Sequence, residues 1–188
     1  SGSAVKITMT RAEVFMGTGP TSGTAMEIKL GASKDGKLTA VKARLTFEAG
    51  AFPGSPVAGG SRTMLGPYVI PNAYVEGLDV VTNVQKSSAY RAPGSPAAAF
   101  AIETAIDEIA EKLNIDPIEF RLLNAAKEGT RQPANGPVYR KIGLVETLDA
   151  AKNHPHYAAD IAGIARGRGI ASGAWFNGSG PASAVASV

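Results

Sequence analysis

Six consecutive residues, Ala89-Tyr90-Arg91-Ala92-Pro93-Gly94, have the types and spacing of an anion-binding turn. They lie between a strand-like segment and a long apolar helix. A turn in this position can direct backbone N–H groups and the positive end of the helix toward an anionic ligand. Arg91 adds a permanent charge and a rigid fork of donors. The plainer interpretation is a tight turn whose arginine pairs with a nearby carboxylate, and six residues alone favour it.

The residues after the turn predict helices. Ser95-Pro96 has the pattern of a helix cap followed by proline in the first helical position. Asn114 can end this helix in a left-handed conformation. A second helix is expected to begin at Asp116-Pro117 and to run to about Ala126, and a third to span 143–152. Helical spacing predicts that the first helix buries one apolar face, made of Phe100, Ile102, Ile106, Ile109, Ala110 and Leu113.

Strand patterns precede the turn. Apolar residues on both sides of the turn at 34–37 predict a hairpin of strands at 24–30 and 38–47. The Gly/Pro/Ser-rich stretch at 50–60 predicts a loop. Further strands are expected at 4–10, 75–84 and 169–176.

This order of elements predicts an α+β fold, with a mostly antiparallel sheet and about three helices in one domain excised from a larger subunit. We interpret residues 1–188 as an internal fragment of that subunit. Residues 1–86 are expected to be mainly strands and loops. Residues 87–153 are expected to contain the turn plus helices, and residues 154–188 a loop and a truncated returning strand.

Composition narrows the classes of function. The net charge is +3 and the basic residues are scattered, so nucleic acid is a poor candidate partner. The absence of cysteine excludes disulfides and a thiolate-held iron–sulfur cluster within these residues. No apolar run approaches the roughly 18 residues of a membrane-spanning helix. We expect no membrane span and a cytoplasmic parent protein, with the periplasm left open.

The acidic residues of the long helix offer a second candidate site. Glu103 lies near the apolar boundary and is expected to pair with an arginine, either Arg121 or Arg91. Helical spacing places the other carboxylates on the solvent-exposed face of the helix. These are Asp107, Glu108 and Glu111.

Two other groups have plainer interpretations than a site. His154-Pro155-His156 offers two imidazoles but no third ligand, which favours a surface loop over a metal centre. Trp175 and Phe176 are expected in the core rather than on a stacking platform.

The stretch from Ser87 to Gly129 favours a ligand contact at the turn over the plainer interpretation. It contains, in order, the turn A-Y-R-A-P-G, the helical run A-I-E-T-A-I-D-E and the segment L-N-I-D-P-I-E-F-R-L-L-N. Upstream, Gly66–Asn72 and the hairpin at Asp35–Leu38 fit the same pattern. Together these segments resemble the molybdenum-binding (molybdopterin-binding) subunit of the xanthine dehydrogenase/aldehyde oxidase family of molybdenum hydroxylases.

The resemblance implies an oxidoreductase. Members hydroxylate an aldehyde or an N-heteroaromatic substrate with water at a molybdopterin-type molybdenum cofactor, of which a cytosine dinucleotide form is one variant. No protein side chain is a direct ligand of the molybdenum, so no metal-ligating residue is expected. The implied partners are an iron–sulfur subunit or domain, a FAD subunit or domain, the rest of its own subunit and a small-molecule substrate.

The same resemblance assigns roles to the turn. It makes Tyr90, Arg91, Ala92 and Gly94 cofactor-binding residues, and it gives Arg91 the stabilisation of charge near molybdenum. It puts Pro93 in the substrate pocket. Purine-oxidising members carry phenylalanine at the position of Pro93, which argues against xanthine as the substrate. Ala92 has no thiol to hold copper, which argues against carbon monoxide dehydrogenase activity.

Two parts of the family's site do not occur in this sequence. The resemblance places a glycine-rich cofactor loop before Ser1 and a glutamate base after Val188. We therefore expect this fragment alone to hold no cofactor and to be inactive, and the complete catalytic subunit to be the enzyme. The alternative is a non-catalytic structural or interaction domain that keeps the fold without the cofactor.

Overall fold

A computed structural model describes residues 2–133 and 135–175 of the chain. The elements are helix α1 (Arg11–Gly17), strands β1 (Thr24–Ala32) and β2 (Leu38–Gly50), helix α2 (Val57–Thr63), strand β3 (Asn72–Val81), and helices α3 (Ser95–Lys112), α4 (Pro117–Asn124), α5 (Leu144–Lys152) and α6 (Pro155–Ala158). The predicted α+β class is confirmed, and the described residues form six helices. None of these helices combines the length and apolarity needed to cross a bilayer.

The described strands form one mixed sheet in the order β1-β2-β3. β1 and β2 are antiparallel, whereas β2 and β3 are parallel. Parallel neighbours need a crossover connection, and α2 with its flanking loops supplies it. The sequence alone predicts a mostly antiparallel sheet because α2 begins inside the stretch at 50–60, whose composition indicates only a loop.

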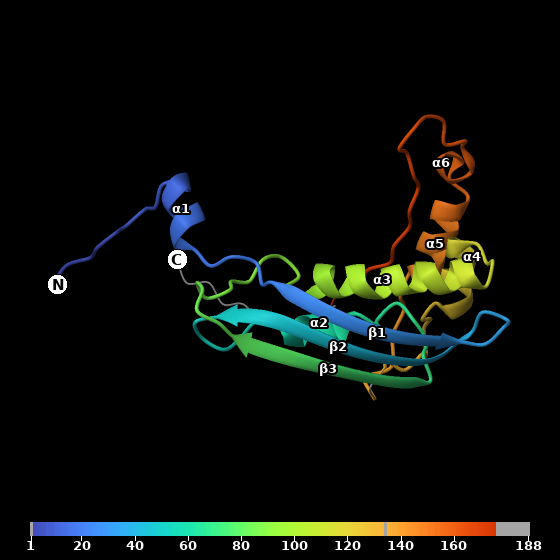
Figure 1. Cartoon of the computed structure of the whole chain (residues 1–188), viewed down its shortest axis with the longest axis horizontal. Coiled ribbons are helices and arrows are strands. Elements are labelled where there is room, and N and C mark those ends of the chain that lie inside the picture. Colours follow the sequence, from blue (N-terminus) through green and yellow to red (C-terminus); the bar gives the residue numbers. More distant parts are fainter. Residues whose placement is uncertain (1, 134, 176–188) are drawn as a thin grey trace, which may run out of the picture.

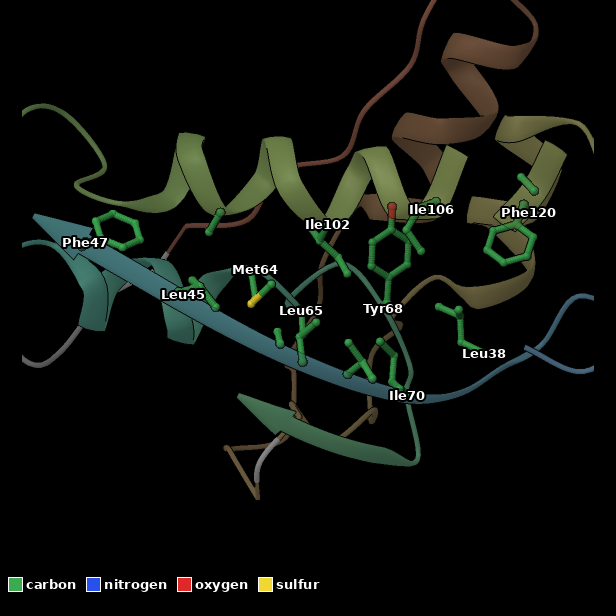
Figure 2. Close-up of a cluster of buried hydrophobic side chains, with 14 residues drawn as sticks. Leu38, Leu45, Phe47, Met64, Leu65, Tyr68, Ile70, Ile102, Ile106 and Phe120 are labelled. Carbon is green, nitrogen blue, oxygen red and sulfur yellow. The ribbon is translucent and has the colours of Figure 1, made fainter. Parts of the chain in front are cut away.

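Helices α2 and α3 pack on one face of the sheet (Figure 1). β2 alternates buried and exposed residues, which sends its apolar side chains toward the helices and its charged ones to the opposite face. Figure 2 shows the resulting core between β2 and α3, to which β2 contributes Leu45 and Phe47 and α3 contributes Ile102 and Ile106. The ring of Tyr68 lies in the same layer, with its hydroxyl directed toward α3.

A buried ion pair joins the helical layer to the core. Glu103 of α3 is 4% exposed, and the Arg121 side chain of α4 is fully buried. Arg121 Nε and Nη2 lie 2.9 and 2.8 Å from Glu103 Oε2. The Tyr68 hydroxyl donates to Glu103 Oε1, and the Ser172 N–H donates to Oε2 at 2.8 Å. The prediction that Glu103 pairs with an arginine is therefore confirmed, and the partner is Arg121 rather than Arg91.

Asp107 extends this cluster to the surface of α3. Arg121 Nη1 lies 2.8 Å from Asp107 Oδ1, so Asp107 is not simply a solvated residue as the helical spacing predicts. Burial, followed by the nearby charge of Glu103, raises the pKa of Tyr68 far above its ordinary value. The phenol therefore stays protonated and serves Glu103 as a hydrogen-bond donor.

Helix boundaries follow the capping signals with one shift. Asp116 caps α4 by accepting hydrogen bonds from two backbone N–H groups of its first turn, and Asn114 follows α3 with a φ of 54°. The predicted start of the second helix at Asp116-Pro117 and the predicted left-handed end of the first helix at Asn114 are both confirmed. The N-cap of α3, however, is Gly94, and Ser95 lies within the first helical turn. The third predicted helix is α5.

Several predictions at the periphery are wrong. Residues 4–10 form no strand, because Thr10 instead caps α1 through a capping box with Glu13. Phe100 is 79% exposed, since it lies on the side of α3 that faces the groove beside β1. Residues 169–175 form neither strand nor helix, and Trp175 is 47% exposed. Phe176 lies outside the described residues.

Glu103→Gln should destabilise the fold strongly, because it removes the buried carboxylate that pairs with Arg121 and leaves the guanidinium only the half-exposed Asp107. Removing one partner of a buried ion pair costs about 3–5 kcal/mol. Arg121→Met should be similarly costly, and the double variant E103Q/R121M should lose clearly less than the sum of the two. Urea unfolding followed by circular dichroism measures the three free energies. Strict additivity would contradict the coupling between the two residues.

Candidate cofactor-contact turn

The Tyr90–Gly94 turn lies where the chain leaves the carboxyl ends of β2 and β3 and enters α3 (Figure 1). The segment before the turn is tied to the end of β2. The Ser87 N–H donates to the Ala49 carbonyl at 2.9 Å, and the Ala51 N–H donates to the Val84 carbonyl at 3.0 Å. The turn is therefore held to the sheet through the residues that precede it, and it is joined to a helix of 18 residues at its C-terminal side.

The backbone of the turn is unusual at two residues. Ala92 has a φ of 55° and Gly94 a φ of 81°. The Ser95 N–H closes the turn by donating to the Ala92 carbonyl at 3.1 Å, and the Gly94 N–H donates to the Tyr90 hydroxyl at 3.2 Å. A left-handed conformation costs an alanine about 1–2 kcal/mol. Such strained residues persist where surrounding contacts hold them, and they cluster at functional sites.

Close backbone contacts hold the turn against α2. A Cβ atom on Gly94 would lie 2.2 Å from the Pro56 carbonyl oxygen, and one on Gly59 would lie 2.3 Å from the Pro93 carbonyl oxygen. Both positions therefore admit only glycine without a shift of the backbone. Sequence reasoning missed Gly59, because the composition of residues 50–60 predicts a loop, whereas Gly59 lies within α2.

Asp79 of β3 fixes the loop that leads into α2. Its carboxylate accepts hydrogen bonds from the N–H groups of Gly54 and Ser55, at 2.7 and 2.8 Å. Lys86 Nζ donates to the Gly54 carbonyl of the same loop at 2.9 Å. Hydrogen bonds from Ser55 and then Gly54 hold the pKa of Asp79 below its ordinary value. Since Pro56 follows this loop directly, the ionised carboxylate helps to position the surface on which Gly94 rests.

The segment at 172–175 packs beside the turn from a distant part of the sequence. Ser95 Oγ donates to the Ala174 carbonyl at 2.9 Å and accepts from Thr63 Oγ1 at 2.9 Å. A Cβ atom on Gly59 would lie 4.0 Å from the ring of Trp175. Trp175 is therefore a neighbour of the α2 glycine that contacts the turn, and not the core residue that its type predicts.

Arg91 is free of the partner that the plainer interpretation requires. Its side chain is exposed, and it forms no ion pair with any described residue. Within the same residues, the backbone N–H groups of Arg91 and Ala92 also have no intramolecular acceptor. The turn therefore offers a fixed cation and two backbone donors to a ligand.

A comparison with known protein families shows which family the chain belongs to. The model of the molybdopterin cofactor-binding domain matches residues 1–125, which include the turn. The chain belongs to the molybdopterin cofactor-binding domain family. The resemblance that the sequence shows to molybdenum-binding subunits is thereby confirmed.

This molybdopterin cofactor-binding domain has larger relatives. It is 36% identical over 130 residues to the nicotinate dehydrogenase large molybdopterin subunit of Eubacterium barkeri, a match that covers 68% of this chain and 31% of the relative. It is 31% identical over 157 residues to the xanthine dehydrogenase molybdenum-binding subunit of Escherichia coli O157:H7, covering 80% of this chain and 20% of the relative. The chain thus spans less than a third of the length of these curated relatives.

Solved structures share the fold. Aldehyde oxidoreductase from Desulfovibrio gigas superposes with a TM-score of 0.67 at 32% identity, over 74% of this chain and 15% of that one. Quinoline 2-oxidoreductase from Pseudomonas putida 86 superposes with a TM-score of 0.68 at 26% identity, over 77% of this chain and 19% of that one.

The turn of this molybdopterin cofactor-binding domain fits an anionic organic cofactor. The free guanidinium of Arg91 and the backbone donors beside it suit a ligand that carries negative charge, as a molybdopterin does through its phosphate. Among the described residues, no three histidine, cysteine, aspartate or glutamate side chains gather as a metal site. His154 and His156 are exposed at the start of α6.

Gly94→Ala should destabilise the chain more than Gly129→Ala. The two glycines have nearly the same positive φ, 81° and 82°, so alanine is strained at both positions. At Gly94 the new methyl group also meets a backbone oxygen, whereas no atom of the described residues lies within 4 Å of the corresponding methyl position at Gly129. Free energies of unfolding in urea measure the difference. Equal losses would contradict the close contact between the turn and α2.

Proposed function

We propose that this chain is the part of a molybdenum hydroxylase catalytic subunit that presents the Tyr90–Gly94 turn to a molybdopterin cofactor. The complete protein oxidatively hydroxylates a small aldehyde or N-heteroaromatic substrate with water. The observation that carries the proposal is the exposed Arg91, a fixed cation on a strained turn with no ionic partner among the described residues. Membership of the cofactor-binding family supplies the kind of ligand that such a turn would hold.

The bound cofactor supplies the two-electron oxidation of the substrate carbon. Arg91 stabilises the negative charge that develops at the reacting centre, an effect that is large where water is excluded. The N–H groups of Arg91 and Ala92 donate to the anionic ligand. The hydroxyl of Tyr90 already accepts the Gly94 N–H, so Tyr90 contributes by keeping the turn in shape. Gly94 contributes by allowing the turn to sit directly on α2.

Pro93 is the residue of the turn that we assign to the substrate pocket. A proline ring is rigid and saturated, so it limits the space beside a substrate without offering a π face to stack on. The names of relatives with this fold include nicotinate dehydrogenase, quinoline 2-oxidoreductase and aldehyde oxidoreductase. These names support both substrate classes, N-heteroaromatic and aldehyde.

The proposal also includes the groups that accept the electrons removed from the substrate. The chain contains no cysteine, so iron–sulfur clusters that take up the electrons must be held outside these 188 residues. We assign them to an iron–sulfur subunit or domain, which passes electrons to a FAD subunit or domain. The cofactor is of the molybdopterin type, and its cytosine dinucleotide form belongs to the same proposal. The 188-residue chain by itself hydroxylates nothing.

Arg91→Ala in the full-length protein should reduce turnover by about 10²–10³, the usual effect of removing one preorganised donor at a developing charge. Turnover must be expressed per bound molybdenum, so that a loss of cofactor is not mistaken for a loss of chemistry. Lys112→Ala is the matched control, since it removes one positive charge from the other end of α3. A variant with full cofactor and wild-type turnover would favour the alternative that the turn belongs to a non-catalytic structural domain.

Pro93→Phe should change which substrate is preferred. A phenylalanine ring adds a stacking face, so kcat/KM for a flat N-heteroaromatic should rise relative to an aldehyde by roughly two- to tenfold. The ratio of the two kcat/KM values, measured on one enzyme preparation, removes differences in cofactor content. Pro93→Ala is the control that lacks both rings. An unchanged ratio in both variants would remove Pro93 from the substrate pocket.

A further inference from the structure

The outward face of the sheet is hollowed at the end opposite the turn. The cavity has a volume of about 910 Å³ and lies over the last residues of β1 and the first residues of β2 and β3. Pairing of the strands places Gly31, Ala40 and Asn72 in one row across the sheet. Two of these three side chains are a hydrogen and a methyl group, so this row forms a low floor. We call this cavity and the cations at its rim the basic hollow.

The next outward-facing row forms one rim of the basic hollow. Lys29 lies directly opposite Lys42 in the antiparallel pair, and Lys42 lies beside Tyr74 in the parallel pair. The ammonium of Lys42 is 5.8 Å from the centre of the Tyr74 ring. Like charges directly opposite each other destabilise a sheet, because their Cβ atoms are only about 4.5–5.5 Å apart. The fold therefore tolerates an unfavourable pair at the edge of an open cavity.

The neighbouring row on the same face is balanced. Glu27 lies opposite Arg44, which lies opposite Glu76, and Arg44 Nε is 3.0 Å from the Glu76 carboxylate. Neither of these glutamates forms an ion pair with Lys29 or Lys42 in the described structure. The charge imbalance is thus confined to the row that borders the cavity.

A third cation approaches the basic hollow from the loop that follows α4. Arg131 lines the cavity, and its Nη1 donates to the Gly136 carbonyl at 3.0 Å. It forms no ion pair with any described residue. The described lining includes no aspartate or glutamate, but it includes two exposed apolar side chains, Val69 and Tyr74. Of these groups, tyrosine and arginine are residue types that are enriched at protein interfaces.

We propose that the basic hollow docks an acidic, extended segment of a partner protein. The carboxylates of such a segment would pair with Lys29, Lys42 and Arg131, and its other side chains would cover Val69 and Tyr74. A small inorganic anion would leave these apolar groups uncovered. The evenly spaced phosphates of a nucleic acid would lie close to the negative charges of Glu27 and Glu76. A peptide can space its carboxylates so that they avoid these two glutamates. The hollow lies at the opposite end of β2 and β3 from the turn, so this proposal does not depend on the one for the cofactor.

The test uses the 188-residue chain and a fluorescein-labelled peptide of alternating glutamate and threonine, about ten residues long so that it crosses the hollow in extended form. Fluorescence anisotropy at about 50 mM salt, where screening is weak, should show saturable binding. The variant K29Q/K42Q should bind about tenfold more weakly, as expected for the loss of two exposed ion pairs. The control K34Q/K37Q has the same net charge and changes two exposed lysines outside the lining, so it should bind as the wild type does.

Three results would overturn the proposal. They are no saturable binding by the wild-type chain, an equal loss in both double variants, and equally effective competition by an oligothymidylate of the same total charge. A separate readout uses the free protein. Lys29→Gln should raise the melting temperature, because it removes the repulsion from Lys42, and a lower melting temperature would contradict the unfavourable row on which the proposal rests.

Discussion

The carboxylate of Glu103 is the point at which four separate segments of the chain meet. It projects from α3 and is held by Arg121 of α4, by Tyr68 of the segment before β3, and by the backbone of Ser172. Each of its oxygens is satisfied, so the desolvation of the charge is offset by several directed interactions and not by one. If this carboxylate were lost, the donors that it accepts from would lose their acceptor, and the apolar face of α3 alone would set its position on the core.

That register matters because α3 carries the turn at its first residue. A helix is stiff over its length, so the position of Gly94 is set from inside the core by Glu103, which lies in the same helix. It is set from outside by α2, through the contacts of Gly94 with Pro56 and of Gly59 with Pro93. The strained backbone of Ala92 lies between these two constraints. Strain of this kind persists only where the surroundings over-determine the conformation, and here they do so from two sides.

Sequence patterns predicted the features that depend on neighbours along the chain. The caps at Asp116 and Asn114 involve residues within one helical turn, and the pairing of Glu103 with Arg121 joins adjacent helices whose apolar faces could be read from their periodicity. Of the candidate site, the sequence alone could predict the turn and its arginine. The lack of an ionic partner for Arg91 among the described residues could not be predicted, because it depends on which carboxylates the fold brings near.

The missed features depend on long-range placement. The contact of Gly59 with Pro93 and the hydrogen bond of Ser95 to Ala174 join residues that no periodic pattern relates. The exposure of Phe100 follows from the position of α3 beside β1, where a groove of about 510 Å³ receives that side of the helix. Helical spacing defines an apolar stripe, but it does not say which part of the stripe the sheet covers.

The parallel pairing of β2 and β3 places the turn and the basic hollow at opposite ends of these two strands. Because the two strands run in the same direction, both of their carboxyl ends reach the turn, and both of their amino ends reach the basic hollow. If β3 were antiparallel to β2, its amino end would lie at the turn and its carboxyl end at the hollow. The connection through α2 would then not lead back to the turn. The crossover through α2, which the composition of residues 50–60 does not reveal, therefore brings Asp79, Pro56 and Gly94 into one series of contacts. β3 begins at the basic hollow and carries Asp79 near its other end. A partner bound at Tyr74 would therefore contact the strand that supports the turn without occupying the turn itself.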